Sequence, residues 1–297
     1  MHDLVIRNGT VIDGTGTESR TADIAINSET IVSVEGHAGP ARREIDADGA
    51  LVTPGWIDIH THYDGQAAWD PLISPSFWHG VTTAMMGNCG VGFAPVRPDA
   101  HDWLIGLMEG VEDIPGAALA EGIPWGWESF AEYLDVLDAN PRAIDIAAQV
   151  PHGAVRAYVM GERGAAQAAA TADEITAMAN IVRDGMAAGA MGFTTSRTAL
   201  HRTIDGEPVP EMDAAAEELI GIGGVLGEFG HATFGLVSDF TDMDAEFAWM
   251  TKIAKTTGRH VWFLMAQTDR NPDMWRDMVD RCRAARAQGA SVTAQVA

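Results

Sequence analysis

The segment PGWIDIHTHYDG, residues 54–65, places two histidines directly after a short apolar run that begins with Pro-Gly. Successive side chains of a β-strand point to opposite faces, so His60 and His62 are expected to project on the same side. Two neutral imidazoles side by side supply half of a tetrahedral zinc site. The alternative is two polar side chains at a strand end. The position after an apolar strand favours a metal site.

A cysteine follows the next apolar run. The segment GVTTAMMGNCGVG, residues 80–92, is typical of a strand that leads into a glycine-rich turn around Cys89. A free cysteine is usually inert core, but a thiolate is a strong zinc ligand. Because parallel α/β barrels carry their chemistry at the carboxyl ends of the strands, we predict that Cys89 shares a metal ion with His60 and His62.

The chain from residue 54 onward alternates strand and helix patterns. Capping boxes at Ser129/Glu132 and Thr171/Glu174 mark two helix starts. Repeated strand–helix units predict an α/β fold with a parallel sheet, and a (β/α)8 TIM barrel over residues 54–297 is the natural solution at this length; a doubly wound open sheet is the alternative. The apolar runs that we interpret as strands are 56–61, 81–87, 144–150, 190–195, 234–238, 260–266 and 291–296.

Residues 1–53 have a different pattern. Short runs alternate apolar and polar residues and are broken by Asn-Gly, Asp-Gly and Gly-Pro, which predicts a small β-sandwich segment. So few strands make too small a sheet to stand alone. The barrel is also incomplete, since it needs eight strands and the chain reaches Ala297 within the seventh. We therefore expect an oligomer or a further C-terminal segment to supply the missing strands.

The amino-acid composition limits the kinds of partner and compartment that we expect for this protein. With 19 Lys+Arg against 42 Asp+Glu the net charge is −23, which argues against nucleic acid or an anionic membrane, because both bind basic surfaces. No uncharged apolar run approaches the roughly 18 residues of a membrane span, and the first residues do not resemble a secretory signal. The two cysteines cannot form a disulfide framework, so we expect a cytoplasmic protein.

Together, PGWIDIHTHYD and VTTAMMGNCG resemble the amidohydrolase superfamily, specifically its D-aminoacylase (N-acyl-D-amino-acid deacylase) branch. The opening DLVIRNGTVIDGTG and the stretch VPHGAVR at 150–156 are also typical of that branch. The resemblance implies a metal-dependent barrel with one or two Zn²⁺ ions and a composite β-sandwich. It further implies hydrolysis of a non-peptide C–N bond in a small N-acyl amino acid or related amide, with His60, His62 and Cys89 as metal ligands.

Lysine usage bears on the enzyme class. The cysteine of this branch replaces the carboxylated lysine of hydantoinases, and the only lysines here are Lys252 and Lys255, in a helical pattern. None lies near the fourth strand. This disfavours a cyclic-amide hydrolase similar to dihydroorotase or hydantoinase, which remains an alternative.

Two departures from the branch concern the metal site and the catalytic base. Its deacylases take further metal histidines after strands five and six, where this chain carries Ser238 or Asp239, and Met265. Methionine is a poor zinc ligand, so weaker metal retention is expected. The branch's catalytic aspartate would lie beyond Ala297, and no catalytic residue is assigned within the chain. Residues 1–297 alone are therefore expected to be neither stably monomeric nor active, and a non-catalytic scaffold is a further alternative.

Four residues after the third and fourth strands are candidates for substrate binding. Arg197, His201 and Arg202 lie in or beside a loop after a strand, where a guanidinium can pair with the carboxylate of an acyl amino acid. His152 can donate to a substrate oxygen. The alternatives are local salt bridges for the arginines and a hydrogen-bonded structural role for His152.

Overall fold

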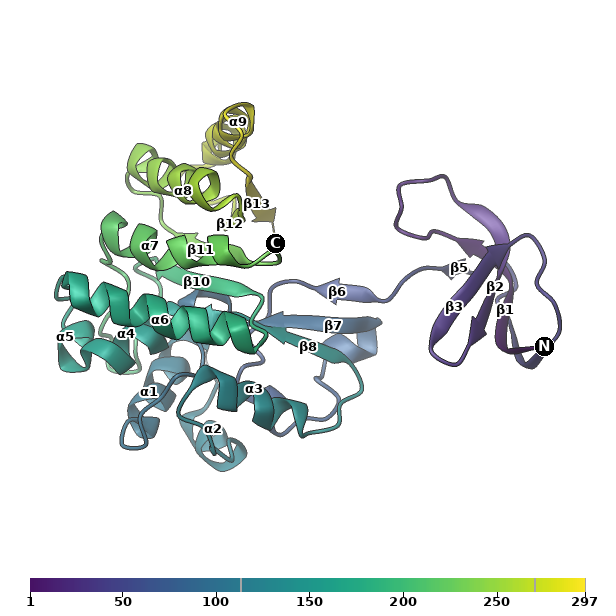
Figure 1. Ribbon diagram of the computed structural model, residues 1–297, viewed down its shortest axis with the longest axis horizontal. Coiled ribbons are helices and arrows are strands. Elements are labelled where there is room, and N and C mark those ends of the chain that lie inside the picture. The colour runs from purple at the N-terminus through teal and green to yellow at the C-terminus, as the bar shows by residue number, and fades with distance from the viewer. Residues whose placement is uncertain (113, 270, 297) are drawn as a thin grey trace. The chain divides into compact units, whose positions relative to one another are not determined.

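The structure is a computed structural model that describes residues 1–112, 114–269 and 271–296. Ala297, which the chain is expected to reach within the seventh strand, lies outside the described residues. The chain divides into two compact units, Met1–Trp56 and Ile57–Ala297 (Figure 1). Among the described helices, none has the length and apolarity needed to cross a bilayer.

The first unit is a five-stranded sheet in the order β3-β2-β1-β4, with β5 also paired to β1. Strands β1, β2 and β3 form an antiparallel meander, whereas β4 and β5 run parallel to β1. The strands are β1 (His2–Val11), β2 (Arg20–Asn27), β3 (Thr30–Glu35), β4 (Ala41–Asp46) and β5 (Leu51–Val52). The short strands expected in this segment are therefore present in one sheet, and the composite β-sandwich stays a prediction.

A buried carboxylate ties the loops of this sheet together. Asp23 is 3% exposed and accepts hydrogen bonds from the backbone N–H groups of Ala38 (2.9 Å) and Asn8 (3.0 Å) and from the Arg7 guanidinium (2.9 Å). These donors hold the pKa of Asp23 below its usual range. Its charged form is therefore part of the fold.

The second unit is a mixed α/β structure built on parallel strands. The hydrogen-bonded orders are β6-β7-β8 and β13-β12-β11-β10-β9, and each of the seven predicted strands has a counterpart. The pairs β7/β8, β9/β10, β10/β11, β11/β12 and β12/β13 are all parallel. The strands are β6 (Trp56–Asp58), β7 (Val81–Met86), β8 (Asp145–Ala148), β9 (Val150–Pro151), β10 (Gly192–Arg197), β11 (Thr233–Ser238), β12 (His260–Met265) and β13 (Val292–Val296).

The third predicted strand is interrupted at one residue. Gln149 separates β8 from β9, donates its backbone N–H to Met86 O (3.0 Å) and donates its side-chain amide to Asn88 Oδ1 (2.9 Å). The backbone also approaches Gly87 so closely that a Cβ there would lie 2.1 Å from Gln149 O. The break therefore locks the third strand to the loop that carries Cys89.

Helices follow most of these strands (Figure 1). Both predicted capping boxes are present, Ser129/Glu132 at the start of α3 and Thr171/Glu174 at the start of α6. The α-helices are α1 (His101–Glu112), α2 (Gly116–Gly122), α3 (Phe130–Asp138), α4 (His152–Met160), α5 (Glu162–Ala165), α6 (Ala172–Ala188), α7 (Ala216–Gly223), α8 (Met243–Thr257) and α9 (Met274–Ala287). The 3₁₀ helices are η1 (Gln66–Ala68), η2 (Ser76–His79), η3 (Asn88–Gly90) and η4 (Gly224–Glu228).

One apolar core joins the strands and helices of the second unit. Phe193 on β10, Phe234 on β11 and Phe263 on β12 have no exposed surface, and Phe193 packs edge-to-face on Phe234 with ring centroids 5.4 Å apart. Burial of such large side chains contributes roughly 25 cal/mol for each Å² of apolar surface removed from water. The core thus fixes the strand ends from which the polar site residues project.

Candidate metal centre

The His60–His62 pair lies after strand β6, which ends at Asp58. The strand predicted over residues 56–61 is therefore shorter than expected, and His60 lies beyond its end. The two imidazole rings are still close together, edge to face, with centroids 5.4 Å apart. The intervening Thr61 is 7% exposed and binds Met85 O through both its backbone N–H (2.9 Å) and its hydroxyl (2.7 Å). This anchor holds the segment extended against β7, so its two neighbours project together.

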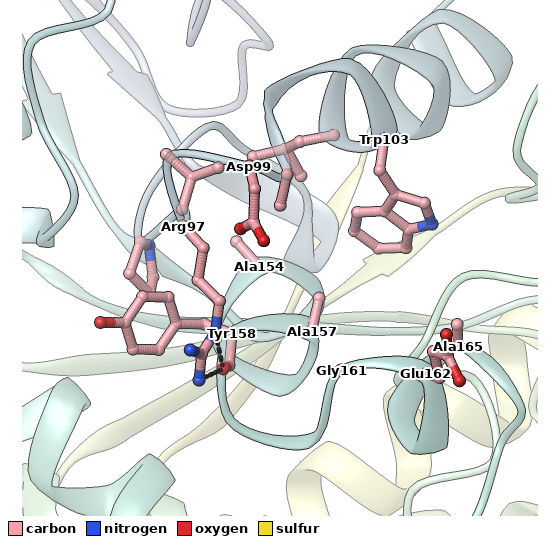
Figure 2. Close-up of a pocket in the computed structure, with 13 residues that line it drawn as sticks. Arg97, Asp99, Trp103, Ala154, Ala157, Tyr158, Gly161, Glu162 and Ala165 are labelled. Atoms are coloured by element: carbon pink, nitrogen blue, oxygen red, sulfur yellow. Dashed lines mark hydrogen bonds between the residues drawn. The ribbon is translucent and has the colours of Figure 1, made fainter.

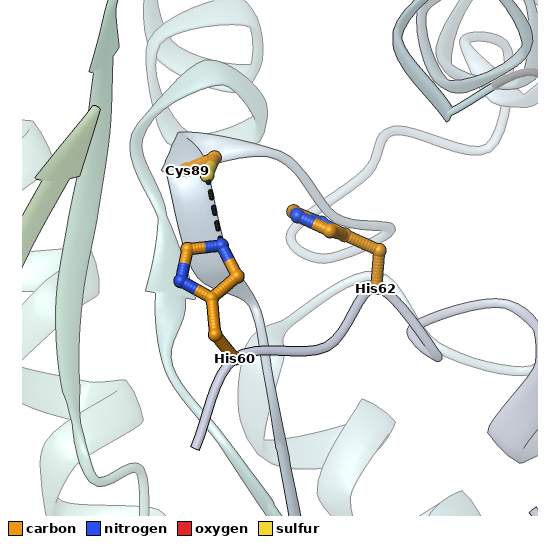
Figure 3. Close-up of side chains that lie close together, drawn as sticks. All are labelled: His60, His62 and Cys89. Atoms are coloured by element: carbon orange, nitrogen blue, oxygen red, sulfur yellow. Dashed lines mark hydrogen bonds between the residues drawn. The ribbon is translucent and has the colours of Figure 1, made fainter. Parts of the chain in front are cut away.

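Cys89 lies in η3, directly after β7. Its φ of 55° is left-handed, and it is flanked by Gly87 and Gly90, each at φ 75°. These left-handed angles reverse the chain direction in a tight turn, and the thiol points toward His60 (Figure 3). The thiol-bearing residue is buried, at 3% exposed.

Asn88 fastens this turn to the histidine segment. Its side-chain amide donates to Thr61 O and to Met85 O, both at 3.0 Å, and its oxygen accepts from Gln149. It has no exposed surface. The sequence analysis missed this residue, although an amide between Gly and Cys at a strand end is a usable signal for a turn anchor.

The three predicted ligands come together in one cluster. Figure 3 shows the side chains of His60, His62 and Cys89 converging, and one ligand atom from each lies within 4.8 Å of the others. His60 Nε2 is 3.2 Å from Cys89 Sγ. Two imidazole nitrogens and a sulfur are donors that zinc prefers, and three protein ligands leave a fourth position open, as catalytic zinc sites do.

Burial sets the protonation states of two members of the cluster, His62 and Cys89. Burial, together with the neighbouring imidazoles of His60 and His201, lowers the pKa of His62 to about 3, so this ring is neutral and can ligate a metal. Burial, with the Glu112 carboxylate and others adding to it, raises the pKa of the Cys89 thiol well above its usual range. A metal ion that binds here must displace the thiol proton. The donor set therefore fits a zinc-type ion.

The positions expected after strands five and six are occupied differently. Ser238 Oγ accepts the backbone N–H of Phe240 at 3.0 Å, and Asp239 accepts the Thr198 hydroxyl at 2.5 Å. Met265 is buried in the core, at 8% exposed. These side chains are used locally, and no imidazole stands in their place.

The three substrate-binding candidates at or after the fourth predicted strand make different contacts. His201 Nδ1 is 2.9 Å from Ser196 Oγ, and burial lowers the pKa of His201 to about 4, with His60 contributing. Arg197 pairs with Glu246 at 2.8 Å. Arg202 donates to two carbonyl groups of its own loop, at 3.0 and 2.8 Å. Of these residues, His201 interacts electrostatically with His60 of the cluster. The two arginines bind protein groups, Arg197 the Glu246 carboxylate and Arg202 the carbonyl groups of its loop.

His152 is fully buried. Its Nδ1 is 2.9 Å from Thr195 Oγ1 and its Nε2 is 3.1 Å from Glu218 Oε1, and the ring has no exposed surface. Glu218 also pairs with Arg156 at 2.8 Å. In this structure both nitrogens are occupied by protein groups, which places His152 in a supporting network.

A cavity of about 410 Å³ opens between residues 95–104 and the helices α4 and α5 (Figure 2). Arg97 lies over the Tyr158 ring, 4.8 Å from its centroid, and Trp103 lines the same cavity. Its lining does not include the three clustered ligands, so this cavity is separate from the candidate metal centre.

Comparisons with curated relatives agree with the geometry. D-aminoacylase from Alcaligenes xylosoxydans xylosoxydans is 37% identical over 194 residues, covering 65% of this chain and 37% of that protein. N-acyl-D-aspartate deacylase from the same organism is 30% identical over 227 residues, covering 75% and 42%. The chain thus spans less than half the length of these relatives.

Solved structures give the same result. A crystal structure of D-aminoacylase matches with a TM-score of 0.80 and 29% identity over 100% of this chain and 58% of that one. N-acyl-D-glutamate deacylase from Bordetella bronchiseptica, complexed with zinc and a phosphonate inhibitor, matches with a TM-score of 0.73 and 28% identity, covering 99% and 58%. An amidohydrolase family model matches residues 43–295, and the chain therefore belongs to the amidohydrolase family.

Proposed function

We propose that this chain carries the metal centre of an enzyme that hydrolyses the amide bond of an N-acyl-D-amino acid. The observation that carries the proposal is the cluster of His60, His62 and Cys89 within 4.8 Å, in a chain that is similar to D-amino-acid deacylases. Zinc suits the nitrogen and sulfur donors, and the described cluster accommodates one ion.

Each residue of the proposed site has a separate task. A bound metal ion would supply a Lewis acid that polarises the acyl carbonyl and acidifies a water molecule. His60 and His62 present imidazole nitrogens, and Cys89 becomes a ligand when it gives up its proton. His201, whose Nδ1 lies 2.9 Å from Ser196 Oγ, keeps its other ring nitrogen for a substrate oxygen. Proton transfer to the leaving amine is assigned to no described residue.

The fold assignment extends this proposal. We propose that residues 54–297 contribute to a (β/α)8 barrel that an eighth strand closes, and that residues 1–53 contribute to a composite β-sandwich. Strand β6 is an end of one set of paired strands and β13 an end of the other, and the two sets meet at Gln149 between β8 and β9. A barrel joins such end strands. The aspartate expected at the end of the eighth strand would then supply the general acid–base function, which is typically worth about 10²–10⁴-fold in rate.

The test is a deacylation assay on the complete gene product loaded with zinc. We expect release of the free amino acid from N-acetyl-D-amino acids and little from their L-enantiomers, and loss of this activity in H60A and C89A. The matched control C282S changes the other cysteine, on α9, and keeps full activity. A zinc-loaded protein that hydrolyses no N-acyl-D-amino acid, or an active C89A protein, would contradict the proposal.

A further inference from the structure

The ring of His60 is held at both nitrogens. Its Nε2 faces Cys89 Sγ at 3.2 Å, and its Nδ1 lies 2.9 Å from Gln295 Oε1. Gln295 is on β13, the last strand of the chain, and its amide oxygen can only accept a hydrogen bond. The His60 proton therefore belongs on Nδ1, which leaves the lone pair of Nε2 directed at the cluster.

The ring of His62 also has a side-chain oxygen at Nδ1, which comes from a carboxylate instead of a neutral amide. Its Nδ1 lies 3.1 Å from Glu112 Oε1, and the two side chains are 22% and 14% exposed. This buried Nδ1 makes no hydrogen bond of regular geometry with the described residues. Glu112 is the last residue of helix α1. Its Oε1 is already at hydrogen-bond distance from Nδ1, so the angle, and not the distance, has to change for the Nδ1–H to reach the carboxylate.

The geometry matches a general property of metal sites. A histidine that ligates a metal through one nitrogen usually donates its other N–H to a carboxylate or carbonyl oxygen, which fixes the tautomer and orients the ring. Figure 3 shows the rings of both histidines turned toward Cys89. Each ring has a side-chain oxygen at Nδ1, supplied by elements distant in sequence.

We propose that Gln295 and Glu112 are positioning residues of the metal centre, which accept the Nδ1–H of His60 and His62 and direct both Nε2 atoms at the metal. This inference rests on the proposed function, because it concerns the same ligands. The two positions differ in effect: the neutral amide orients His60, whereas the carboxylate also makes His62 a more basic ligand.

The first test reads the tautomers without metal or substrate. Long-range ¹H–¹⁵N NMR of the metal-free protein, with resonances assigned through H60N and H62N, is expected to show that the neutral tautomer of each ring carries its proton on Nδ1. Q295L should release His60 to a mixture of tautomers and leave His62 unchanged. A wild-type protein in which His60 or His62 carries its proton on Nε2 would overturn the inference.

The second test reads zinc affinity by competition with a chelator. E112A and Q295A are expected to weaken zinc binding by about 10- to 100-fold, whereas E112Q and Q295E, which keep an acceptor oxygen, stay closer to wild type. E121A removes the same charge from an exposed position on α2 and should bind zinc as wild type does. Unchanged affinity in E112A would overturn the role of Glu112.

Cobalt spectra separate positioning from direct ligation. If Glu112 orients His62, the visible absorption of the Co²⁺ protein keeps its shape in E112Q, because the ligands are unchanged. A changed spectrum in E112Q would make Glu112 itself a ligand and overturn the inference. None of these measurements needs substrate, so a protein that deacylates nothing contradicts the proposed function while the tautomers and affinities still decide this inference.

Discussion

His60 Nε2 lies 3.2 Å from Cys89 Sγ, although 29 positions separate the two residues in sequence. The contact depends on the turn after β7, which Asn88 fastens to Thr61 O at 3.0 Å. The separation is a hydrogen-bond distance. Two ligands that share one tetrahedral zinc ion lie slightly farther apart, because Zn–N and Zn–S bonds are about 2.1 and 2.3 Å.

Replacement of the thiol tests its role as a ligand. C89S is expected to lose stoichiometric zinc, since a hydroxyl is a far weaker zinc donor than a thiolate. C282S changes the half-buried cysteine of α9 and should retain zinc. Metal analysis after gel filtration measures both; equal zinc in the two variants would remove Cys89 from the site.

The buried network around Arg156 predicts a large effect on stability. Its Nε pairs with Glu218 at 2.8 Å, and the two side chains are 1% and 2% exposed. R156A leaves the buried Glu218 carboxylate without its cationic partner and with the His152 ring nitrogen at 3.1 Å, which should lower the free energy of unfolding by about 3–5 kcal/mol. R183A breaks an exposed pair with Glu228, which solvent screens, and should change the free energy of unfolding far less. Urea unfolding of both variants checks the difference.

Close packing at Gly235 predicts a steric effect beside the site. A Cβ at this position would lie 2.0 Å from the Trp262 ring, whose centroid is 5.7 Å from that of His60. G235A should therefore displace Trp262 and lower the free energy of unfolding by about 1–3 kcal/mol. G224A meets nothing within 4 Å and serves as control. Tryptophan fluorescence during urea unfolding reads both effects; similar stability of the two variants would contradict the packing.

Acid should loosen the N-terminal sheet through Asp23. Its pKa in the folded protein is held below 3.8 by the N–H of Ala38 first, so the folded state binds fewer protons than the unfolded chain at acid pH. The stability it provides is complete above 3.8 and is lost as the pH falls toward the lower folded-state value. D23N should reduce this dependence without abolishing it, because Glu44 and Asp46 of the same sheet also have lowered pKa values. D48N, at an exposed position, should leave it unchanged. Hydrogen exchange of β1 and β2 amides against pH measures this.

Much of this architecture is predictable because strand runs and ligand types are local signals. The His60–Thr61–His62 pattern and Cys89 each follow an apolar run, so parallel strands predict that they lie at the same edge of the sheet. The contact itself also needs the left-handed turn at Cys89 and the Asn88 hydrogen bond to Thr61 O. The break at Gln149 is not predictable in this way, because it arises from the close approach of its carbonyl to Gly87.

The supporting groups of the site are also hidden from sequence. Glu112 ends a helix and Gln295 lies in the last strand, so their contacts with the histidines depend on tertiary packing. For His152, the position after the third strand left a substrate contact and a structural role open, and the structure buries the ring against Glu218. Burial of a polar residue depends on the whole fold, and a strand-end position alone does not determine it.

X-ray absorption spectroscopy of the zinc-loaded protein tests the central claim most directly. We predict one zinc ion per chain, with one sulfur at about 2.3 Å, nitrogen or oxygen at about 2.0–2.1 Å, and the outer-shell pattern of two imidazoles. C89S should lose the sulfur component. A zinc shell without sulfur in the wild-type protein, or a wild-type protein that retains no zinc, would contradict a metal centre built from His60, His62 and Cys89.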